Sequence, residues 1–272
     1  MTGARTGKRR DRLDRLLVER GLARSRERAQ ALILAGVVRV DGRPGGKAGT
    51  LVPDGATLSL IGPDHPFVGR GGVKLQGALE RLGLDPAGRT VLDVGASTGG
   101  FTDCLLQQGA RRVYALDVGV GQLDWKLRND PRVVVVEGCN ARYLTAADLP
   151  ERFGLVVVDV SFISLRLILP ALPPLLTDPA DVLPLVKPQF EVGRGEVGPG
   201  GLVTDPRQHL EVLRRVASEA IALSFGLLGA CRSPITGAEG NQEFFLHLAA
   251  GRTGLQGGEV DELLTGVVDA GE

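Results

Sequence analysis

Five apolar runs of strand length, separated by stretches of helical character, limit what this chain can fold into more than any other feature. The runs read "TVLDVGAS", "RVYALDV", "RVVVVEG", "LVVVDVSF" and "VLPLVK". Continuous, β-branched strands of this kind are typical of a parallel sheet that helices cover on both faces. The alternation therefore predicts a doubly wound α/β domain, and two later runs, "LGACRSP" and "NQEFFLHLAA", extend its sheet to seven strands.

A separate, small α+β module is predicted ahead of this domain. Two helical stripes with i, i+3, i+4 spacing are formed there by Leu13, Leu16, Leu17, Ala29, Leu32 and Ile33. Ser25 is suited to cap the second helix, and Gly21 and Gly36 are suited to end the two helices. The stretch "VVRVDGRP" comes next, with Asp41-Gly42 as a turn signal, and "ATLSL" predicts one more short strand.

Charge is distributed unevenly along the chain. Residues 1–50 hold 13 Lys and Arg against 5 Asp and Glu, a balance of +8. The whole chain holds 32 residues of each sign, so the remaining residues carry a balance of −8. A basic head on an acidic body is typical of a protein whose head binds a polyanion, although a merely solvated arginine-rich arm would show the same balance.

The head also carries a recognisable pattern. Within residues 11–61, the stretch "RLDRLLVERGLARSRERAQALILAGVVRVDG" resembles the alpha-L RNA-binding domain of a small-subunit ribosomal protein, tyrosyl-tRNA synthetases and pseudouridine synthases. The resemblance implies a basic helix face that holds RNA backbone, as A-form RNA favours. The candidate phosphate contacts, each of which could also be merely solvated, are Arg12, Arg15, Arg24, Arg26, Arg28 and Arg39. Residues 62–68, "GPDHPFV", are predicted to be a linker.

In the large domain, the first strand runs into a glycine turn, "VLDVGASTGGFTD" at residues 91–103. Open parallel sheets bind nucleotide-like ligands beyond the carboxyl ends of their strands, where glycines let the backbone approach closely. The glycine spacing departs from the G-x-G-x-x-G of dinucleotide-binding sites, and a lone glycine-rich stretch can be only a tight turn. The stretch resembles instead the first motif of class I methyltransferases that use S-adenosylmethionine.

The methyltransferase resemblance implies which residues hold the cofactor. The acidic residue and the turn that hold its amino-acid portion are Asp93, Gly95, Ser97, Thr98, Gly99 and Gly100. Asp117 ends the next strand, 24 positions after Asp93, which suits a carboxylate that accepts hydrogen bonds from ribose hydroxyls. Asn140 comes after the third strand and is expected to meet the adenine edge.

Four charged residues are expected to meet at the same edge of the sheet. Lys74 precedes the first strand, Asp159 ends the fourth, Lys187 ends the fifth and Glu243 begins the last. An apolar strand leads directly into Lys187, and a buried ammonium group needs a compensating charge. Each residue alone could be an ordinary ion pair at a strand end, but two lysines and two carboxylates can neutralise one another beside a cofactor.

This Lys–Asp–Lys–Glu set resembles the catalytic tetrad of FtsJ-like ribose 2'-O-methyltransferases. The resemblance implies that an amine accepts the proton of a ribose hydroxyl as the methyl group leaves the sulfonium. We expect Lys187 to be this base, Lys74 to orient the ribose, and the two carboxylates to set the lysine and the cofactor methyl. Burial and the sulfonium favour a neutral amine, whereas the carboxylates favour an ammonium, and the sequence leaves that balance open.

Longer stretches, among them "FVGRGGVKL", "DVSFISLRLILP" and "VKPQFEVGR", resemble the TlyA family, also called hemolysin A, from about residue 11 to residue 249. Membership implies 2'-O-methylation of cytidines in 16S and 23S ribosomal RNA. One departure is Gly69, where the family more often has serine. The predicted organisation is an RNA-binding domain at 11–61, a linker at 62–68, a methyltransferase domain at 69–250 and a tail with one helix at 251–272.

Three other functions remain open. A base N-methyltransferase commonly has an Asn- or Asp-Pro-Pro-aromatic motif after the fourth strand, where this chain has "DVSF". An RNA-binding protein with an inactive methyltransferase fold would keep the head without the chemistry. A membrane-active hemolysin is suggested by the family name alone, since the sequence shows no apolar segment of membrane-spanning length and no signal peptide.

The cysteines indicate the compartment. Cys104, Cys139 and Cys231 have neither the spacing of a metal site nor the even number of a disulfide framework, which favours a reducing cytoplasm. We therefore expect a cytoplasmic, monomeric, metal-free enzyme that uses S-adenosylmethionine and acts on ribosomal RNA or a ribosomal subunit. The sequence does not show which subunit or nucleotide would be modified.

Overall fold

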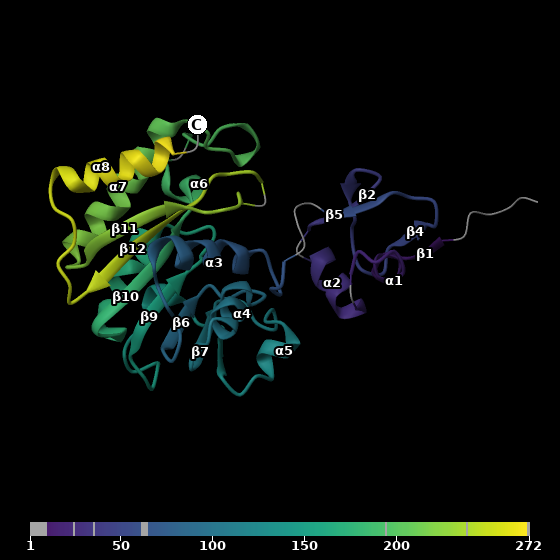
Figure 1. The fold of residues 1–272 in the computed structure, drawn as a ribbon, viewed down its shortest axis with the longest axis horizontal. Helices are drawn as coiled ribbons and strands as arrows, with labels where there is room; N and C mark the ends of the chain where they lie inside the picture. The colour runs from purple at the N-terminus through teal and green to yellow at the C-terminus, as the bar shows by residue number, and fades with distance from the viewer. Residues whose placement is uncertain are drawn as a thin grey trace, which may run out of the picture. The chain divides into compact units, whose positions relative to one another are not determined.

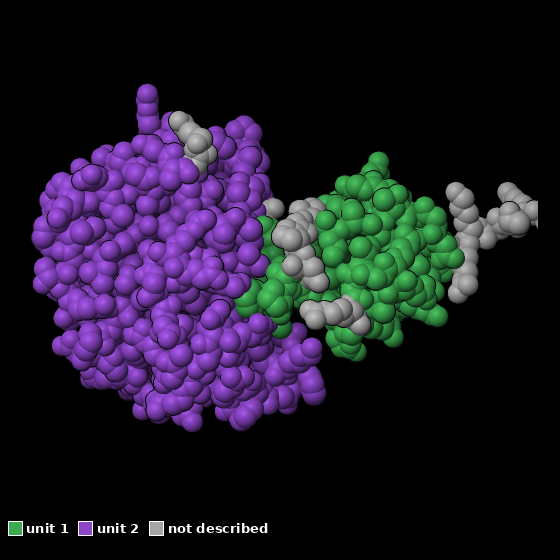
Figure 2. All heavy atoms as spheres, in the orientation of Figure 1, with its two compact units in different colours: residues 1–70 green, residues 71–272 purple. Residues whose placement is uncertain are grey.

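A computed structural model describes residues 10–23, 25–34, 36–60, 65–193, 195–237 and 239–270 of the chain. The chain divides into two compact units, residues 1–70 and residues 71–272, which are green and purple in Figure 2. Each unit has a hydrophobic core of its own, as separate domains do. The finer limits of head, linker, body and tail stay a prediction.

The small unit combines two helices with two small sheets. Its elements are β1 (Arg10–Arg12), α1 (Leu13–Glu19), α2 (Arg26–Leu34), β2 (Val38–Val40), β3 (Arg43–Pro44), β4 (Leu51–Pro53) and β5 (Leu58–Leu60). β1 pairs antiparallel with β4, and β2 lies between β3 and β5. Leu13, Leu16 and Leu17, which form the first predicted stripe, are at most 3% exposed and pack with α2 in one core. The α+β prediction for the head is confirmed.

Local signals explain most of this unit. Ser25 Oγ accepts the backbone N–H of Arg28 at 3.2 Å and so caps α2. Asp41 and Gly42 both have positive φ, 50° and 78°, which is the geometry of a tight hairpin between β2 and β3. The pairing of β1 with β4 was not predicted, because strands of three residues are too short to show a periodic pattern.

The large unit is built on one seven-stranded sheet with helices packed against it (Figure 1). Its strands are β6 (Thr90–Val94), β7 (Arg112–Asp117), β8 (Val133–Glu137), β9 (Phe153–Val158), β10 (Leu176–Val186), β11 (Gly226–Arg232) and β12 (Phe244–Ala250). Its α-helices are α3 (Gly71–Leu82), α4 (Gly100–Gln107), α5 (Trp125–Arg128), α6 (Pro188–Glu191), α7 (Pro206–Ala222) and α8 (Gly258–Asp269). Its short 3₁₀ helices are η1 (Ala141–Tyr143), η2 (Leu165–Leu167), η3 (Leu169–Ala171), η4 (Pro173–Leu175) and η5 (Pro199–Gly201).

The direction in which successive strands are added to the sheet reverses at β6, inside the sheet. The order is β11-β12-β10-β9-β6-β7-β8, so the chain adds β7 and β8 on one side of β6 and then β9 and β10 on the other. Doubly wound sheets bind ligands at such a reversal, beyond the carboxyl ends of the strands. The neighbouring pairs from β10 to β8 are all parallel, which confirms the predicted α/β fold.

Strand β12 is the exception, because it runs antiparallel to both β10 and β11. Val186 at the end of β10 pairs with Phe244 at the start of β12. The first residue of β12 therefore lies at the same edge as the last residues of β9 and β10. In this way, residues just before β12 lie near the carboxyl ends of β9 and β10, where ligands bind in doubly wound sheets.

The tail contributes α8, whose Leu264 and Val268 are buried and which packs next to α7. Both residues belong to the helical pattern that the sequence shows in this stretch. Across the ranges given above, no helix has the length and apolar character needed to cross a membrane.

Candidate active site

The glycine turn after β6 follows a tight backbone path. Gly95 and Gly99 have φ of 88° and 97°, a region that glycine occupies readily and other residues rarely enter. A Cβ atom on Gly95 would overlap the backbone carbonyl of Asp159, so the turn passes directly against the end of β9. Glycine at this position is therefore required by close backbone packing, whether or not a ligand is bound.

A pocket of about 510 Å³ lies at this turn. Five of the residues predicted for the site line it, namely Gly95, Ser97, Asp117, Asn140 and Asp159. Four other predicted cofactor residues, Asp93, Thr98, Gly99 and Gly100, belong to the same strand and turn but do not form its wall. The pocket is at the edge of the sheet where the strand order reverses, as the fold predicts.

Asp117 and Asn140 line this pocket, and both side chains can form hydrogen bonds beyond those they make within the protein. Asp117 accepts the backbone N–H groups of Ser97 and Gly119, both at 2.7 Å. Each carboxylate oxygen can accept a further hydrogen bond, so the group remains suited to a ribose diol. Asn140 Oδ1 accepts the N–H of Arg142 at 3.1 Å and caps η1, and the two amide donors of Asn140 take no part in that cap.

Asp93 is fully buried, yet only one of its two carboxylate oxygens accepts a hydrogen bond from a described residue. Oδ2 accepts the hydroxyl of Thr102 at 2.6 Å, whereas Oδ1 has no hydrogen-bond partner among the described residues. Burial raises the pKa of Asp93 to about 7. A buried acceptor without a donor is costly, so this oxygen fits a ligand that supplies a cationic or N–H group.

The four charged residues form two ion pairs, one of which adjoins the pocket through Asp159. Lys74 Nζ lies 2.5 Å from Glu243 Oε2, and Lys187 Nζ lies 2.6 Å from Asp159 Oδ1. The side chains of both lysines and Glu243 are at most 11% exposed, so each charge is compensated at short range. The side chain of Asp159 is 20% exposed and lines the pocket. The ion pair between Lys187 and Asp159 is therefore the one next to the pocket.

Four distant segments supply these side chains. Lys74 lies in the first turn of α3, Asp159 comes directly after β9, Lys187 joins β10 to α6, and Glu243 precedes β12. The Lys74–Glu243 contact spans 169 positions of the sequence. The antiparallel direction of β12 brings Glu243 to this edge, where strand ends alone would bring only Asp159 and Lys187.

Two further residues beside Lys187 were not singled out from the sequence. Lys187 Nζ donates a hydrogen bond to Ser161 Oγ at 2.9 Å. Phe162 is 91% exposed, has a φ of 62°, and its ring centroid lies 5.1 Å from that of Phe190. Positive φ is rare for a bulky residue. The only signal in the sequence was the position of both residues closely after Asp159, in "DVSF".

In the small unit, two of the predicted RNA-binding arginines hold a buried acid. Arg12 and Arg26 lie 2.9 Å and 3.1 Å from Asp14 Oδ2, and Asp14 is 0% exposed. The hydrogen bond from Arg12 is the main reason why the pKa of Asp14 is well below its usual value. The side chains of Arg12 and Arg26 are still 45% and 55% exposed, so both stabilise the fold while their outer surfaces remain accessible.

The other predicted arginines differ in the contacts that they make within the small unit. Arg15, whose side chain is 58% exposed, pairs with Asp11 and Glu19. Arg28 and Arg39 donate to backbone carbonyls of their own unit. Arg24 lies outside the described residues. Contact of any of these arginines with RNA stays a prediction.

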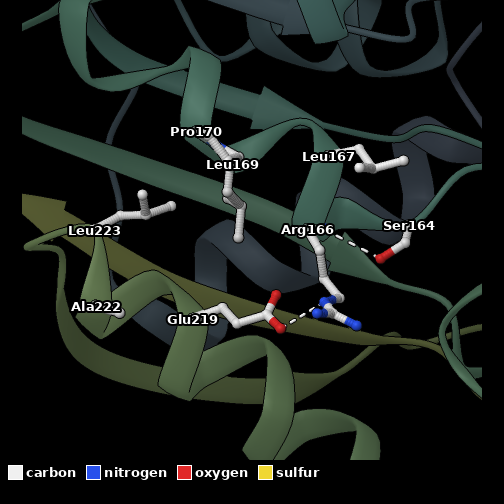
Figure 3. Close-up of a pocket in the computed structure, with 8 residues that line it drawn as sticks. All are labelled: Ser164, Arg166, Leu167, Leu169, Pro170, Glu219, Ala222 and Leu223. Atoms are coloured by element: carbon white, nitrogen blue, oxygen red, sulfur yellow. Dashed lines mark hydrogen bonds and ion pairs between the residues drawn. The ribbon is translucent and has the colours of Figure 1, made fainter.

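A larger pocket, of about 650 Å³, is formed by η2, η3 and the last turn of α7 (Figure 3). Leucines form much of its wall, and Arg166 pairs with Glu219 at 2.5 Å. None of the residues predicted for the site lines this pocket. Its size alone therefore does not make it a candidate for catalysis.

Comparison with known proteins adds independent findings. A model of the FtsJ-like methyltransferases matches residues 67–250, and a model of the S4 domain matches residues 11–58. The chain is 53% identical over 241 residues to the "16S/23S rRNA (cytidine-2'-O)-methyltransferase TlyA" of Mycobacterium tuberculosis, with 88% of this chain and 90% of that protein covered.

Two further similarities concern proteins described as hemolysins. The chain is 40% identical over 237 residues to the "Hemolysin A" of Brachyspira hyodysenteriae, with 87% of this chain and 98% of that protein covered. A solved structure from Streptococcus thermophilus, provisionally described as a hemolysin, is 41% identical with a TM-score of 0.76 and covers 97% of this chain and 96% of its own. These similarities extend over both units of the chain.

Proposed function

The chain belongs to the FtsJ-like methyltransferase family, in its TlyA branch, and we propose that it methylates the 2'-hydroxyl of cytidines in 16S or 23S ribosomal RNA. The observation that carries this proposal is the presence of two buried lysine–carboxylate pairs, of which the Lys187–Asp159 pair adjoins a pocket at the switch point of the sheet. The name of the M. tuberculosis relative, at 53% identity, supports the same substrate.

The residues of the pocket fit S-adenosylmethionine as the methyl donor. The Asp117 carboxylate lines the pocket and suits ribose hydroxyls. Asp93 does not line the pocket, but it lies in the strand that leads into the glycine turn, and its buried oxygen without a partner among the described residues suits an ammonium group. Asn140 offers an amide to an adenine edge, and the turn from Ser97 to Gly100 offers small residues beside the amino-acid portion. S-adenosylmethionine bound there would supply an activated methyl group.

We assign the proton transfer to Lys187. A ribose hydroxyl is too weakly acidic to ionise at neutral pH, so a neutral amine has to accept its proton as the oxygen takes the methyl group. Asp159 at 2.6 Å and Ser161 at 2.9 Å hold the Nζ atom of Lys187 at the pocket. Asp159 would then stabilise the ammonium group that forms.

Lys74 and Glu243 are assigned to positioning of the target ribose. Their pair is the more deeply buried of the two, with side-chain exposures of 11% and 3%. Both lysines are paired at similar distances, so the assignment rests on position: Asp159, the partner of Lys187, lines the pocket, whereas neither Lys74 nor Glu243 does.

The small unit is proposed to hold the RNA. Its match to the S4 domain and the +8 balance of residues 1–50 both support this role. A ribosomal RNA substrate implies action in the cytoplasm, and we propose that the protein acts there as a monomer.

The test is methylation of isolated ribosomal subunits and naked rRNA by the purified protein with labelled S-adenosylmethionine, followed by nucleoside mass spectrometry. The expected product is 2'-O-methylcytidine. A methyl group on a base would favour the N-methyltransferase alternative, and lack of turnover on both subunits and naked rRNA would favour an RNA-binding protein with an inactive fold.

A further inference from the structure

A second buried carboxylate lies one helical turn after Lys187. Glu191, the last residue of α6, is only 8% exposed. It accepts the hydroxyl of Ser164 at 2.7 Å and the backbone N–H of Leu165 at 2.8 Å. Both donors belong to the loop after β9, which also carries Asp159. Glu191 therefore connects the segment of one tetrad residue to the loop of another.

The loop contacts the segment 187–191 at three successive points. Ser161 Oγ accepts from Lys187, the ring of Phe162 packs against Phe190, and Glu191 accepts from the far end of the loop. The two stretches thus lie alongside each other from end to end. Since Glu191 binds a backbone N–H as well as a side chain, it fixes the path of the loop and not only one rotamer.

This loop needs external support to keep its shape. Phe162 adopts a φ of 62° although it is not glycine, and its ring is 91% exposed, so little burial offsets the strained backbone. Such conformations persist only where the surroundings determine them. At the C-terminal end of the loop the Leu165 side chain is buried in the core, and the buried hydrogen bond from its backbone N–H to Glu191 fixes the backbone there.

The charges around Glu191 indicate that hydrogen bonding, rather than an ion pair, is its main role. Within the described residues its carboxylate makes no ion pair shorter than 4.0 Å, and Arg215 donates to its backbone carbonyl instead. Burial raises the pKa of Glu191, the two hydrogen bonds and the charge of Arg215 oppose that rise, and Glu219 adds to it.

From this geometry we infer that Glu191 is a positioning residue for methyl transfer. It holds the loop so that Ser161 lies against Lys187 and Phe162 lies against Phe190, without touching substrate or cofactor. The inference rests on the proposed function, because the loop matters for catalysis only if Lys187 is the base.

Glu219 offers a matched control, because its carboxylate binds the same segment of the chain in a different way. It pairs with the side chain of Arg166 at 2.5 Å, at the pocket drawn in Figure 3, so its contact is with a side chain and not with the loop backbone. Loss of Glu219 therefore removes a surface ion pair, which is worth little in water. Loss of Glu191 removes two hydrogen bonds, a buried one from the Leu165 N–H and a partly buried one from the Ser164 hydroxyl.

The experiment compares four variants of the full chain at saturating RNA and S-adenosylmethionine. Glu191→Ala is expected to lower kcat by at least about tenfold, because small displacements of a catalytic group are costly, while affinity for S-adenosylmethionine stays within about twofold. Glu191→Gln can still accept from Leu165 and should restore kcat to within about threefold of wild type. Ser164→Ala should cause a smaller loss of kcat, and Glu219→Ala should cause none.

Three outcomes would overturn the inference: wild-type kcat in folded Glu191→Ala, an equal loss in Glu219→Ala, or a loss in Glu191→Gln as large as that in Glu191→Ala. If Glu191→Ala does not fold, Ser164→Ala and Glu191→Gln decide, and wild-type kcat in Ser164→Ala contradicts the inference. Wild-type protein that fails to methylate rRNA contradicts the proposed function and, with it, the role of Glu191.

Discussion

Asp14 in the small unit and Asp93 in the large unit are both 0% exposed, yet their surroundings are opposite. Asp14 accepts hydrogen bonds from two arginines and a glutamine, and its pKa is lowered. Asp93 accepts from one threonine, keeps one oxygen without a partner among the described residues, and has its pKa raised to about 7. A buried charge with a complete set of partners stabilises a fold, whereas an incomplete set marks where a ligand can bind.

The largest expected effect is on the rate of methyl transfer, and it tests whether the buried charges of the large unit serve catalysis. Lys187→Ala removes the proposed base and should lower the rate of methyl transfer by about 10³-fold, within the range of general-base catalysis. Its affinity for rRNA should remain within about twofold of wild type, because the small unit is proposed to hold the RNA. Single-turnover methylation and filter binding on the same RNA measure both quantities. A comparable loss of RNA affinity would contradict the division between the two units.

Asp93→Asn tests the raised pKa of Asp93 through the pH dependence of the free energy of unfolding. The pKa of Asp93 in the folded protein, about 7, lies above its value of about 4 in the unfolded chain, so the folded state holds the proton more tightly. The resulting stabilisation is complete below about pH 4 and is lost as the pH rises through about 7, up to about 4 kcal/mol in all.

Without its titrating group, the Asn variant should gain stability relative to wild type between about pH 5 and pH 8, and it should bind S-adenosylmethionine more weakly at about pH 8. Urea unfolding at several pH values and calorimetric titration of the ligand check the two parts. A difference in stability that does not change with pH would contradict the raised pKa.

Asp14→Ala tests the opposite case, a buried charge with complete partners. We expect the small unit to lose about 2 kcal/mol of stability at about pH 7, less than a fully buried pair would cost because Arg12 and Arg26 can turn toward water. The pKa of Asp14 is lowered in the folded state, so its contribution is present above about pH 4 and lost as the pH falls further.

Hydrogen exchange resolved to α1 and α2 measures this loss within the small unit. Glu19→Ala is the control, because the 48% exposed Glu19 carboxylate pairs with the exposed side chain of Arg15 at 3.1 Å and its loss should change stability by less than about 0.5 kcal/mol. Equal effects of the two variants would show that burial of Asp14 has no special importance.

The smallest effects separate arginines that bind RNA from arginines that stabilise the fold. Arg15→Gln should weaken rRNA binding by a few-fold and reduce the salt dependence by about one contact, with no change in melting temperature. Arg12→Gln should lower the melting temperature, because it removes the strongest partner of Asp14. Titration at several salt concentrations and thermal unfolding distinguish the two. An unchanged salt slope in Arg15→Gln would remove Arg15 from the RNA-binding surface.

The sequence predicts the fold well, because its signals are local. The apolar strands, the glycine turn and the two leucine stripes each appear within a few residues, and each is present in the structure. The convergence of Asp159 and Lys187 also follows, since carboxyl ends of parallel strands share one edge. The contact of Lys74 with Glu243 does not follow, because it depends on the reversed direction of β12.

Side chains whose roles depend on a loop path are harder to predict. Asp14 is a polar residue beside a leucine stripe and gives no sign of full burial, which depends on arginines and a glutamine reaching it from α2 and β1. Ser161, Phe162 and Glu191 act together only because the loop after β9 lies along α6. Such packing is set by tertiary structure and leaves no periodic trace in the sequence.

The late position of β12 in the sequence also determines when the four charged residues can come together during translation. The nascent chain emerges with the small unit first, then Lys74, and only 169 positions later the carboxylate that neutralises this lysine. A truncated product ending before β12 would carry every basic residue of the head and the whole glycine turn, but an ammonium group without its counter-ion. The small unit, which is proposed to hold the RNA, is thus synthesised well before the tetrad is complete, and Glu243 with β12 completes the tetrad.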